Sequence, residues 1–433
     1  MLQLEMPGIR GEDFRDAFAV LGELIVRDTP TFGFEHPFMG PGGLYGNCWW
    51  ERDSSLTLVG YKWLDQRFCE DSLLNFAYVQ KENGRIPLYG HDRVRDFDEQ
   101  LSAIPVIYEA ALGICRRTTD KDYIKKIYDM LSRYTGWWLS PIKRDAETGL
   151  VCGIFEETDP CDNLIQHAAA QVDLNVQICV GADCLRQMAL YLGLDGDAAK
   201  WEKVFAEQKA IINEYLYEPA DGAYYTWLIG EKRRMIERSY NTMFDVFKRG
   251  ILPKDREMRL VNLMHDDTLF GWNREYAMTT MARTAHEYQE TTGPYKGHTS
   301  WMGNIWTFRN EIIATGLEEY GRMEDAAYLA MKTVKEFSGK YAEFISPTDG
   351  SGHGVERYGW TASQYIELIV ERLIGLDYDA WNDKLTVTPN LPDELKNSRI
   401  TLKNASLGDG RYVNVAIDKG EVRTEITDKI TED

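Results

Sequence analysis

The sequence of 433 residues lacks several features that mark whole classes of protein. It has 49 lysines and arginines against 69 aspartates and glutamates, and this net charge of −20 offers no positive face to nucleic acid or to an anionic membrane. No apolar run approaches the roughly 18 to 20 residues that span a bilayer, and residues 1–7 lack the basic start and apolar stretch of a signal peptide. We therefore predict a cytoplasmic protein that binds neither nucleic acid nor membrane. The sequence leaves its oligomeric state open.

Cofactor and metal motifs are missing as well. The seven cysteines are odd in number and show no CxxC spacing, which predicts reduced thiols that pack as small hydrophobic residues. Glycine-rich nucleotide-binding, P-loop, zinc-binding histidine and EF-hand patterns are absent. We therefore predict no cofactor and assign no metal ligand.

Helical spacing of apolar residues, at i, i+3, i+4 and i+7, is present over nearly all of the first 375 residues. Short turns alternate with long loops rich in Trp, Gly and Asp, as in six helical hairpins, and long loops inside a compact domain are usually functional. We therefore predict an all-α-dominated fold, an (α/α)6 toroid over residues 1–376 with its site at the long-loop end. Polar caps, glycines and prolines place the helices at residues 12–27, 53–64, 68–82, 98–117, 121–139, 168–193, 197–216, 237–247, 255–264, 304–321, 323–338 and 358–375.

The pattern changes to strand-type alternation after Leu376. Proline, asparagine and glycine turns separate the alternating segments. We predict a small β appendage, residues 377–433, packed on the toroid. Its expected strands are residues 384–388, 399–402, 412–417 and 421–426.

Two acidic segments point to a chemistry. Residues 155–163 place four carboxylates just ahead of a predicted helix, in a loop where Pro160 prevents helix continuation. Glu343 lies in a second loop, flanked by aromatic residues, which make up 12% of the chain. Two separated acids in aromatic surroundings are the minimum for cleaving a glycosidic bond, because one protonates the leaving oxygen while the other activates water or attacks carbon.

Six motifs follow one another between residues 45 and 390. They are Trp49-Trp50-Glu51-Arg52-Asp53; Gln80 with Gly84, Ile86 and Pro87; Glu157-Thr158-Asp159-Pro160-Cys161-Asp162-Asn163; Val172-Asp173-Leu174-Asn175; Trp301-Met302-Gly303-Asn304-Ile305-Trp306; and Glu343 with Pro347, Gly350 and Tyr358-Gly359-Trp360-Thr361-Ala362. This ordered set resembles the inverting (α/α)6-barrel glycosidases of glycoside hydrolase family 63 and the related trehalases of family 37. The acidic loop is one residue longer here than in the family, and Met302 and Asn304 replace an arginine and a proline.

The resemblance implies roles for these residues. Asp162, followed by Asn163 as in the family, would be the general acid; the extra loop residue leaves Asp159 as the alternative. Glu343 would be the general base. Glu157 would contact substrate or hold the acidic loop, with a solvated surface acid as the alternative. The substrate-binding residues implied are Trp49, Trp50, Arg52, Asp53, Gln80, Glu157, Asn163, Trp301, Trp306 and Trp360.

The expected activity is inverting, exo-acting hydrolysis of a short α-linked glycoside or disaccharide. Inversion requires about 6.5 to 9.5 Å between the two carboxyl groups, which leaves space for the attacking water. One alternative is a non-hydrolytic sugar enzyme, such as an epimerase, lyase or phosphorylase, which would use His167, His298 or His353. The other is a carbohydrate-binding protein whose acidic loop has lost catalysis.

Overall fold

Helices dominate the computed structural model, which describes residues 2–27, 34–90, 94–95, 101–154, 157–158, 169–291 and 301–431. Its α-helices are α1 (Gly11–Glu23), α3 (Glu51–Leu56), α4 (Leu58–Tyr61), α5 (Gln66–Val79), α6 (Ile107–Cys115), α7 (Lys121–Trp138), α8 (Val172–Leu192), α9 (Asp195–Ile211), α10 (Glu257–His265), α11 (Thr307–Tyr320), α12 (Met323–Phe337) and α13 (Gly359–Glu367). The 3-10 segments are η1 (Gly43–Tyr45), η4 (Asn241–Gly250), η5 (Lys254–Arg256) and η7 (Asp393–Leu395), and the π-helical segments η3 (Ile212–Leu216) and η6 (Leu368–Leu373) continue α9 and α13.

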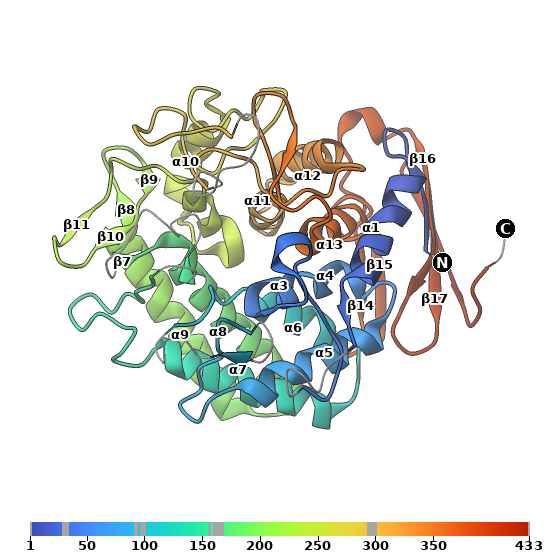
Figure 1. Ribbon diagram of the computed structural model, residues 1–433, viewed down its shortest axis with the longest axis horizontal. Coiled ribbons are helices and arrows are strands. Elements are labelled where there is room, and N and C mark those ends of the chain that lie inside the picture. Colours follow the sequence, from blue (N-terminus) through green and yellow to red (C-terminus); the bar gives the residue numbers. More distant parts are fainter. Residues whose placement is uncertain are drawn as a thin grey trace.

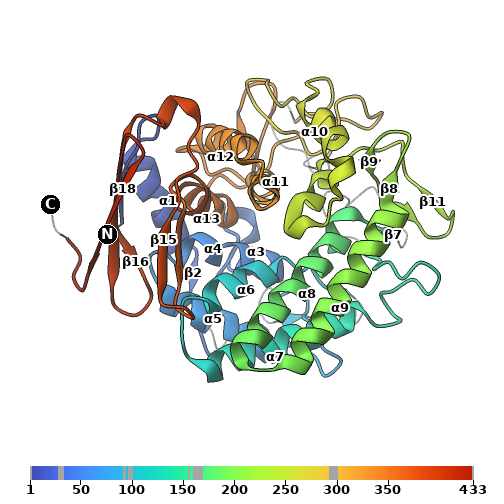
Figure 2. The ribbon, with the colours of Figure 1, turned by 180° about the vertical axis from the view of Figure 1, so that it is seen from behind.

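The inner helices contact one another in a closed cycle. The cycle starts with α3 and α4, which both contact α6. It continues in chain order through α8, η4, α11 and α13, each in contact with the next, and it closes where α13 packs against α3 and α4. Figures 1 and 2 show these helices around a common centre, with α5, α7, α9 and α12 outside them. The described part of the chain is therefore a helical ring with further helices packed on its outside.

Burial along the sequence explains which helices lie inside. In α11, every residue from Thr307 to Leu317 is buried. In α12, the buried residues follow one face, and charged residues such as Glu324 occupy the other. A helix that is buried all round belongs in an interior, and an amphipathic helix covers it.

Gly60 permits the close contact that completes the cycle between α4 and α13. A Cβ atom at this position would lie 2.2 Å from the carbonyl oxygen of Ser363. The Gly60 N–H instead donates to the Ser363 hydroxyl at 2.8 Å. Any larger residue would force the two helices apart.

Two predicted helices in the first part of the chain have other limits. The predicted helix 12–27 ends at Glu23, because Ile25 and Val26 form strand β2 (Ile25–Val26), which pairs with β3 (Phe38–Met39). β-Branched residues fit a pleated strand better than a helix end. The predicted helix 53–64 begins earlier and is interrupted at Thr57, whose hydroxyl donates to the Ser54 carbonyl and so competes with helical bonding.

Two later helices also differ. In the predicted helix 98–117, residues 101–106 are not helical and α6 begins at Ile107, after Pro105. Proline disfavours helical geometry in the residue before it. The segment predicted at 237–247 is the 3-10 segment η4.

The predicted strands near the C-terminus are present, and an unpredicted N-terminal strand joins them. The four-stranded antiparallel sheet has the order β1-β16-β17-β18, with Leu4 opposite Leu402, and lies at one side of the helical ring (Figure 1). The division at residues 376 and 377 stays a prediction. The strands are β1 (Gln3–Glu5), β4 (Trp49–Trp50), β5 (Tyr89–Gly90), β6 (Val94–Arg95), β7 (Ala169–Ala170), β8 (Tyr217–Glu218), β9 (Ala223–Tyr224), β10 (Trp227–Leu228), β11 (Arg233–Arg234), β12 (Phe344–Ile345), β13 (Gly352–His353), β14 (Leu376–Asp379), β15 (Lys384–Val387), β16 (Arg399–Ser406), β17 (Tyr412–Asp418) and β18 (Glu421–Thr427).

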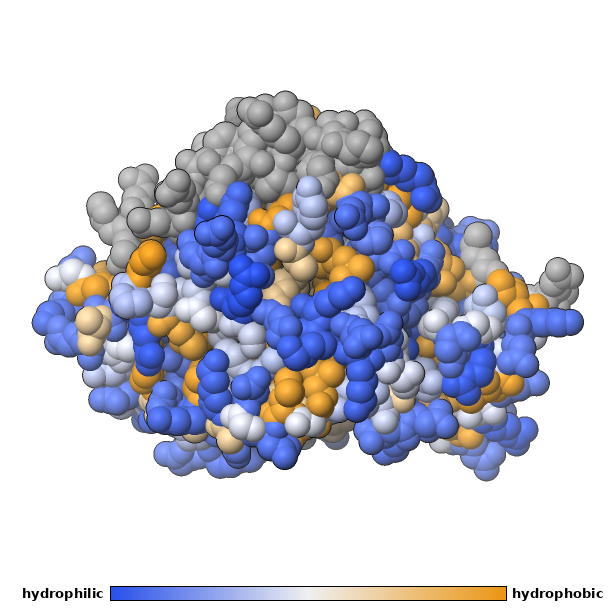
Figure 3. All heavy atoms as spheres, turned by 90° about the horizontal axis from the view of Figure 1, so that it is seen from below, coloured by the Kyte–Doolittle hydropathy of each residue, from blue (hydrophilic) through white to orange (hydrophobic). Residues whose placement is uncertain are grey.

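Hydrophilic residues predominate on the described surface seen in Figure 3, and hydrophobic residues form small scattered groups there. Within the described ranges, no helix combines the length and the apolar character needed to cross a bilayer.

Candidate active site

Aromatic residues gather where inner helices begin. Trp306 and Tyr358 immediately precede α11 and α13. With Trp301, Phe344 and Trp360 they belong to one buried group, which we call the aromatic cluster. Because a helix N-terminus carries partial positive charge, this end of the ring favours carboxylates.

Glu343, the predicted base, is held here by two uncharged donors. Its Oε1 accepts a hydrogen bond from the Tyr45 hydroxyl at 3.0 Å, and its Oε2 accepts one from the Val355 N–H at 3.1 Å. The Glu343 N–H in turn donates to the Val355 carbonyl at 2.8 Å. The carboxylate is therefore fixed in orientation and buried to 7% exposure.

Gly354 makes room for this carboxylate. Its φ of +73° is a left-handed conformation, and a Cβ atom there would lie 2.2 Å from Oε2 of Glu343. Only glycine satisfies both requirements without strain.

A second carboxylate, Asp53, lies beside the first. Its Oδ1 accepts a hydrogen bond from the Tyr358 hydroxyl at 2.8 Å. Burial, together with the charges of Asp53 and Glu343, raises the pKa of Tyr358 well above its usual range, so the phenol remains a donor. The rings of Tyr45 and Tyr358 lie 6.1 Å apart. Two tyrosines thus connect the two predicted site acids.

The other charged residues of this motif, Glu51 and Arg52, are also buried. The Arg52 guanidinium carbon lies 6.0 Å from the Trp301 ring centre. Glu51 is fully buried, and neither of its carboxyl oxygens has a hydrogen-bond partner among the described residues. Burial raises the pKa of Glu51 well above its usual range despite the nearby Arg52, which favours the neutral form of this carboxyl group.

The acidic loop is described only at Glu157 and Thr158. Asp159, Asp162 and Asn163 lie outside the described residues, and their predicted roles stay predictions.

Glu157 is neither a solvated surface acid nor placed to contact a sugar, because its side chain is fully buried in a salt bridge. Its two oxygens accept hydrogen bonds from Lys143 at 2.6 and 2.5 Å. The N–H groups of Ser102 and Ile154 donate to the same carboxylate at 2.9 and 3.1 Å. The Thr158 hydroxyl contacts both carboxylate oxygens of Asp173, in the first turn of α8, at 3.1 Å. These contacts fit the prediction that Glu157 holds the loop.

The first two predicted substrate-binding tryptophans lie in one strand. Trp49 and Trp50 are neighbours in β4 and therefore point to opposite faces. Trp49 is fully buried in the main core, where it contacts Phe34 and Phe76, so it is not part of the site. Trp50 is half-buried and meets Tyr45 edge to face at 6.1 Å.

The remaining predicted tryptophans pack on one another. Trp301 and Trp306 are stacked at 3.9 Å with their planes 3° apart, and Trp306 also stacks on Phe344 at 5.0 Å. Trp360 packs against Trp306 and Phe308. Trp306 is 1% exposed, so in this structure it supports the site and Trp301 lies above it.

Gln80 serves the scaffold. Its amide donates to the carbonyls of Gly84 and Met130, both at 2.8 Å, and so ties the turn after α5 to α7. Gln80 is not a member of the aromatic cluster among the described residues, and its role as a sugar contact stays a prediction.

Of the three histidines named for a non-hydrolytic sugar enzyme, only His353 lies among the described residues. His353 stacks on Phe344 at 6.0 Å and shares a hydrogen bond with the Ser351 hydroxyl, and burial lowers its pKa. His167 and His298 lie outside the described residues. No group of three or more metal-binding side chains occurs in the ranges that the structure describes.

Sequence reasoning missed Tyr45, Lys143 and the hydroxyl of Tyr358 as parts of the site. Tyr358 lies within a motif that was recognised only as a helix start. Lys143 precedes Arg144-Asp145 and meets Glu157 through a loop that no spacing rule predicts. Tyr45 lies 298 positions from its partner Glu343, so no local signal marks it.

Solved structures of carbohydrate-cleaving enzymes share this fold. The glycoside hydrolase family 63 mannosylglycerate hydrolase of Thermus thermophilus, solved with glucose, superposes with a TM-score of 0.67 at 18% identity, over 81% of this chain and 98% of that one. The neutral trehalase of Saccharomyces cerevisiae superposes with a TM-score of 0.58 at 16% identity, over 77% and 73% of the two chains. The fold is thus that of a helical glycosidase.

The family follows from the sequence. The family model described as the mannosylglycerate hydrolase MGH1-like glycoside hydrolase domain matches residues 46–361, so the chain belongs to this family and is a glycosidase. A mannosylglycerate hydrolase of Rubrobacter radiotolerans is 32% identical over 73 residues. That match spans 16% of this chain and 16% of the length of that relative.

Proposed function

We propose that this glycosidase hydrolyses a short α-linked glycoside from its end, with inversion. Asp162 is the general acid of this proposal and Glu343 the general base. The arrangement of Glu343 is the observation that supports it most, because the Tyr45 hydroxyl and the Val355 N–H orient its buried carboxylate, and an oriented carboxylate can accept a proton from water. The inner ring and the helices outside it support an (α/α)6 toroid of six hairpins as the scaffold.

The substrate proposal combines the site with the names of relatives. Trp50, Arg52 and Trp301 provide aromatic and cationic groups close to Asp53 and Glu343, suited to a sugar with a small acidic aglycone. Relatives are named mannosylglycerate hydrolases, so α-linked glycosyl-glycerates are the first substrates to test, followed by α-linked aryl glycosides and disaccharides.

The deciding experiment combines two variants with product analysis. Glu343→Gln and Asp162→Asn should each lower kcat by about a thousandfold or more with unchanged circular dichroism, because each removes one half of a two-carboxylate mechanism. The control is Glu356→Gln, an exposed glutamate of the same segment. Substantial activity in either site variant would refute its role, and loss in Asp159→Asn alone would transfer the acid role to Asp159.

Proton NMR of the first-formed anomer tests the stereochemistry. The β-anomer should appear first from an α-linked substrate. First appearance of the α-anomer would contradict inversion, an epimerised product with the glycosidic bond intact would favour a non-hydrolytic enzyme, and tight binding without turnover would favour a binding protein.

A further inference from the structure

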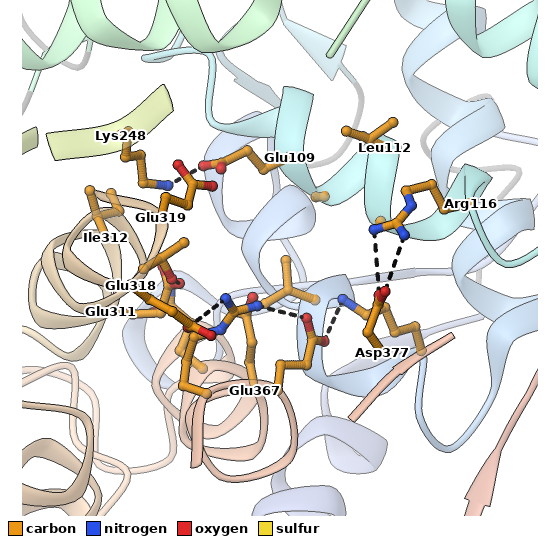
Figure 4. Close-up of a pocket in the computed structure, with 18 of the residues that line it drawn as sticks. Glu109, Leu112, Arg116, Lys248, Glu311, Ile312, Glu318, Glu319, Glu367 and Asp377 are labelled. Carbon is orange, nitrogen blue, oxygen red and sulfur yellow. Dashed lines mark hydrogen bonds and ion pairs between the residues drawn. The ribbon is translucent and has the colours of Figure 1, made fainter. Parts of the chain in front are cut away.

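A second cavity lies at the opposite end of the inner helices. It has a volume of about 370 Å³ and is lined by residues at the last turns of these helices, such as Lys248 of η4, Glu318 of α11 and Arg372 of η6. The β14–β15 hairpin contributes Asp377 to its wall. We call it the distal cavity (Figure 4).

An apolar layer separates the distal cavity from the candidate active site. Leu56, Val106 and Ile312 belong to the aromatic cluster and also line the cavity. The aromatic cluster and the distal cavity therefore meet at these apolar residues, which lie among the described residues of both.

The carboxyl groups that line the cavity outnumber its basic groups. Its lining contains seven carboxyl groups and five basic groups. Each basic group has a carboxylate of its own, and Figure 4 shows Lys248 beside Glu109 and Arg116 facing Asp377. The remaining pairs are Lys62 with Glu371 at 2.7 Å, Arg249 with Glu319 at 2.9 Å and Arg372 with Glu318 at 3.0 Å.

Glu311 and Glu367 remain outside these pairs. Glu311 accepts a hydrogen bond from the Thr315 hydroxyl, and no hydrogen bond or salt bridge joins Glu367 to a described residue. Burial, with the charges of Glu311 and Glu371, raises the pKa of Glu367 well above its usual range. The negative C-terminal ends of the inner helices add to the same potential. This environment favours a proton on Glu367, and a bound cation could take the place of that proton.

Two buried amides give independent evidence for a ligand. Gln364 is fully buried, and both its amide oxygen and its amide nitrogen lack hydrogen-bond partners in the described part of the chain. Gln177 is 1% exposed, and its amide oxygen likewise lacks a partner there. Both side chains line the cavity. Each unsatisfied buried polar group costs about 1 to 3 kcal/mol, so a molecule with both donors and acceptors would be stabilised there.

The chemistry of the lining indicates an organic cation over a metal ion. No three metal-binding side chains converge among the described residues, and five basic groups surround the space. A primary ammonium can donate to Glu367, Glu311 and an amide oxygen, and a hydroxyl group can accept from the Gln364 amide. We propose that the distal cavity is a second ligand site that binds a small amino alcohol, in which the ammonium ion neutralises Glu311 and Glu367.

The test compares 3-amino-1,2-propanediol with glycerol, which has a hydroxyl in place of the amine. Isothermal titration calorimetry on the full chain should show binding of the amine and at least tenfold weaker binding of glycerol. Repeating the titration in buffers of different ionisation enthalpy should show proton release, because the amine replaces the proton on Glu367. Glu367→Gln should weaken amine binding at least tenfold, and Glu311→Gln should weaken it similarly, whereas Glu356→Gln should leave it unchanged.

The variant Glu343→Gln separates this cavity from the catalytic pocket. Amine binding should persist in Glu343→Gln, because the apolar layer separates the two sites. Loss of binding in Glu343→Gln with retention in Glu367→Gln would assign the amine to the catalytic pocket and overturn the proposal. Three other results would overturn the proposal: glycerol binding as tightly as the amine, calcium or magnesium ions binding more tightly than the amine, or no probe binding at 100 mM. The third result would show that the cavity holds water alone.

Discussion

The two ends of the inner helices hold their acids in opposite ways. At the N-terminal ends, the described contacts of Glu343 and Asp53 are with uncharged donors: two tyrosine hydroxyls and one backbone N–H. At the C-terminal ends, lysines and arginines pair with the carboxylates of the distal cavity. The helix dipoles explain part of this difference, because N-termini stabilise carboxylates and C-termini stabilise cations.

The difference has a chemical consequence. A salt bridge fixes a carboxylate but reduces its ability to accept a proton, and a hydroxyl or N–H donor fixes it while leaving its charge available. Glu157 shows the contrast within the site end itself, because it is fully buried against Lys143. The salt bridge with Lys143 therefore suits Glu157 to holding the loop.

Removal of Lys143 should give the largest effect. Lys143→Met leaves Glu157 buried without its cation, and breaking a buried ion pair from one side costs about 3 to 5 kcal/mol. Lys62→Met at the distal cavity should cost less, about 1 to 2 kcal/mol, because its partner Glu371 keeps a second cation, Arg372, as well as the hydrogen bond from Trp63. Guanidinium unfolding curves measure both values, and equal costs would show that Arg372 does not compensate Glu371 for the loss of Lys62.

Glu336 should make stability depend on pH. Burial raises its pKa from 4.5 to about 8, and its described hydrogen bond comes from the Ala277 N–H. Between these values the folded state holds one more proton than the unfolded chain, so the stability that Glu336 contributes is complete below pH 4.5 and is lost as the pH rises toward 8.

The measurement compares Glu336→Gln with the natural protein at pH 5 and pH 7. The stability of the natural protein relative to this variant should fall by about 3 kcal/mol over these two pH units. Glu356→Gln should not change the pH dependence. Parallel curves for Glu336→Gln and the natural protein would show that Glu336 is ionised when folded.

A side chain at Gly354 should disturb the base directly. Gly354→Ala places a methyl group where Oε2 of Glu343 now lies, and we expect kcat to fall about a hundredfold, equivalent to about 2.7 kcal/mol. Gly193→Ala is the matched control, because Gly193 has a φ of +76° with no atom within 4 Å of the added Cβ. Gly193→Ala introduces the backbone strain of a left-handed alanine without a steric clash. We expect it to lower the free energy of unfolding slightly and to leave kcat unchanged. A similar kcat for both variants would show that Glu343 tolerates displacement.

Much of this architecture could be predicted from periodicity, and the exceptions have local causes. The helices α7 and α12 follow from apolar spacing, because their buried residues lie on one face. The split at Thr57 and the strand at Ile25 and Val26 depend on tertiary contacts that helical spacing does not contain. Strand β1 is three residues long, and only its distant partner β16 makes it a strand.

The site was predictable only as far as motifs mark it. Glu343 and Asp53 lie in recognised motifs, and the structure places them near each other. Trp49 was assigned to the site through its motif, and a motif does not show which of two adjacent strand residues faces inward. Tyr45 and Lys143 could not be predicted, since long-range hydrogen bonds leave no spacing in the sequence.

Tyr45→Phe should give the smallest and most specific effect. It removes one uncharged donor from Glu343 and retains the ring that packs on Trp50 and Tyr358. The lost hydrogen bond is worth about 1.4 kcal/mol when the acceptor is charged, so kcat/KM should fall roughly tenfold. Because the lost bond favoured the ionised carboxylate, the acidic limb of the kcat/KM profile should also move to higher pH. Tyr78→Phe, at a largely exposed tyrosine, should change neither quantity. A tenfold loss with an unshifted acidic limb would mean that Tyr45 acts through packing alone, and the distinction between uncharged donors and salt bridges would then not explain how Glu343 is kept reactive.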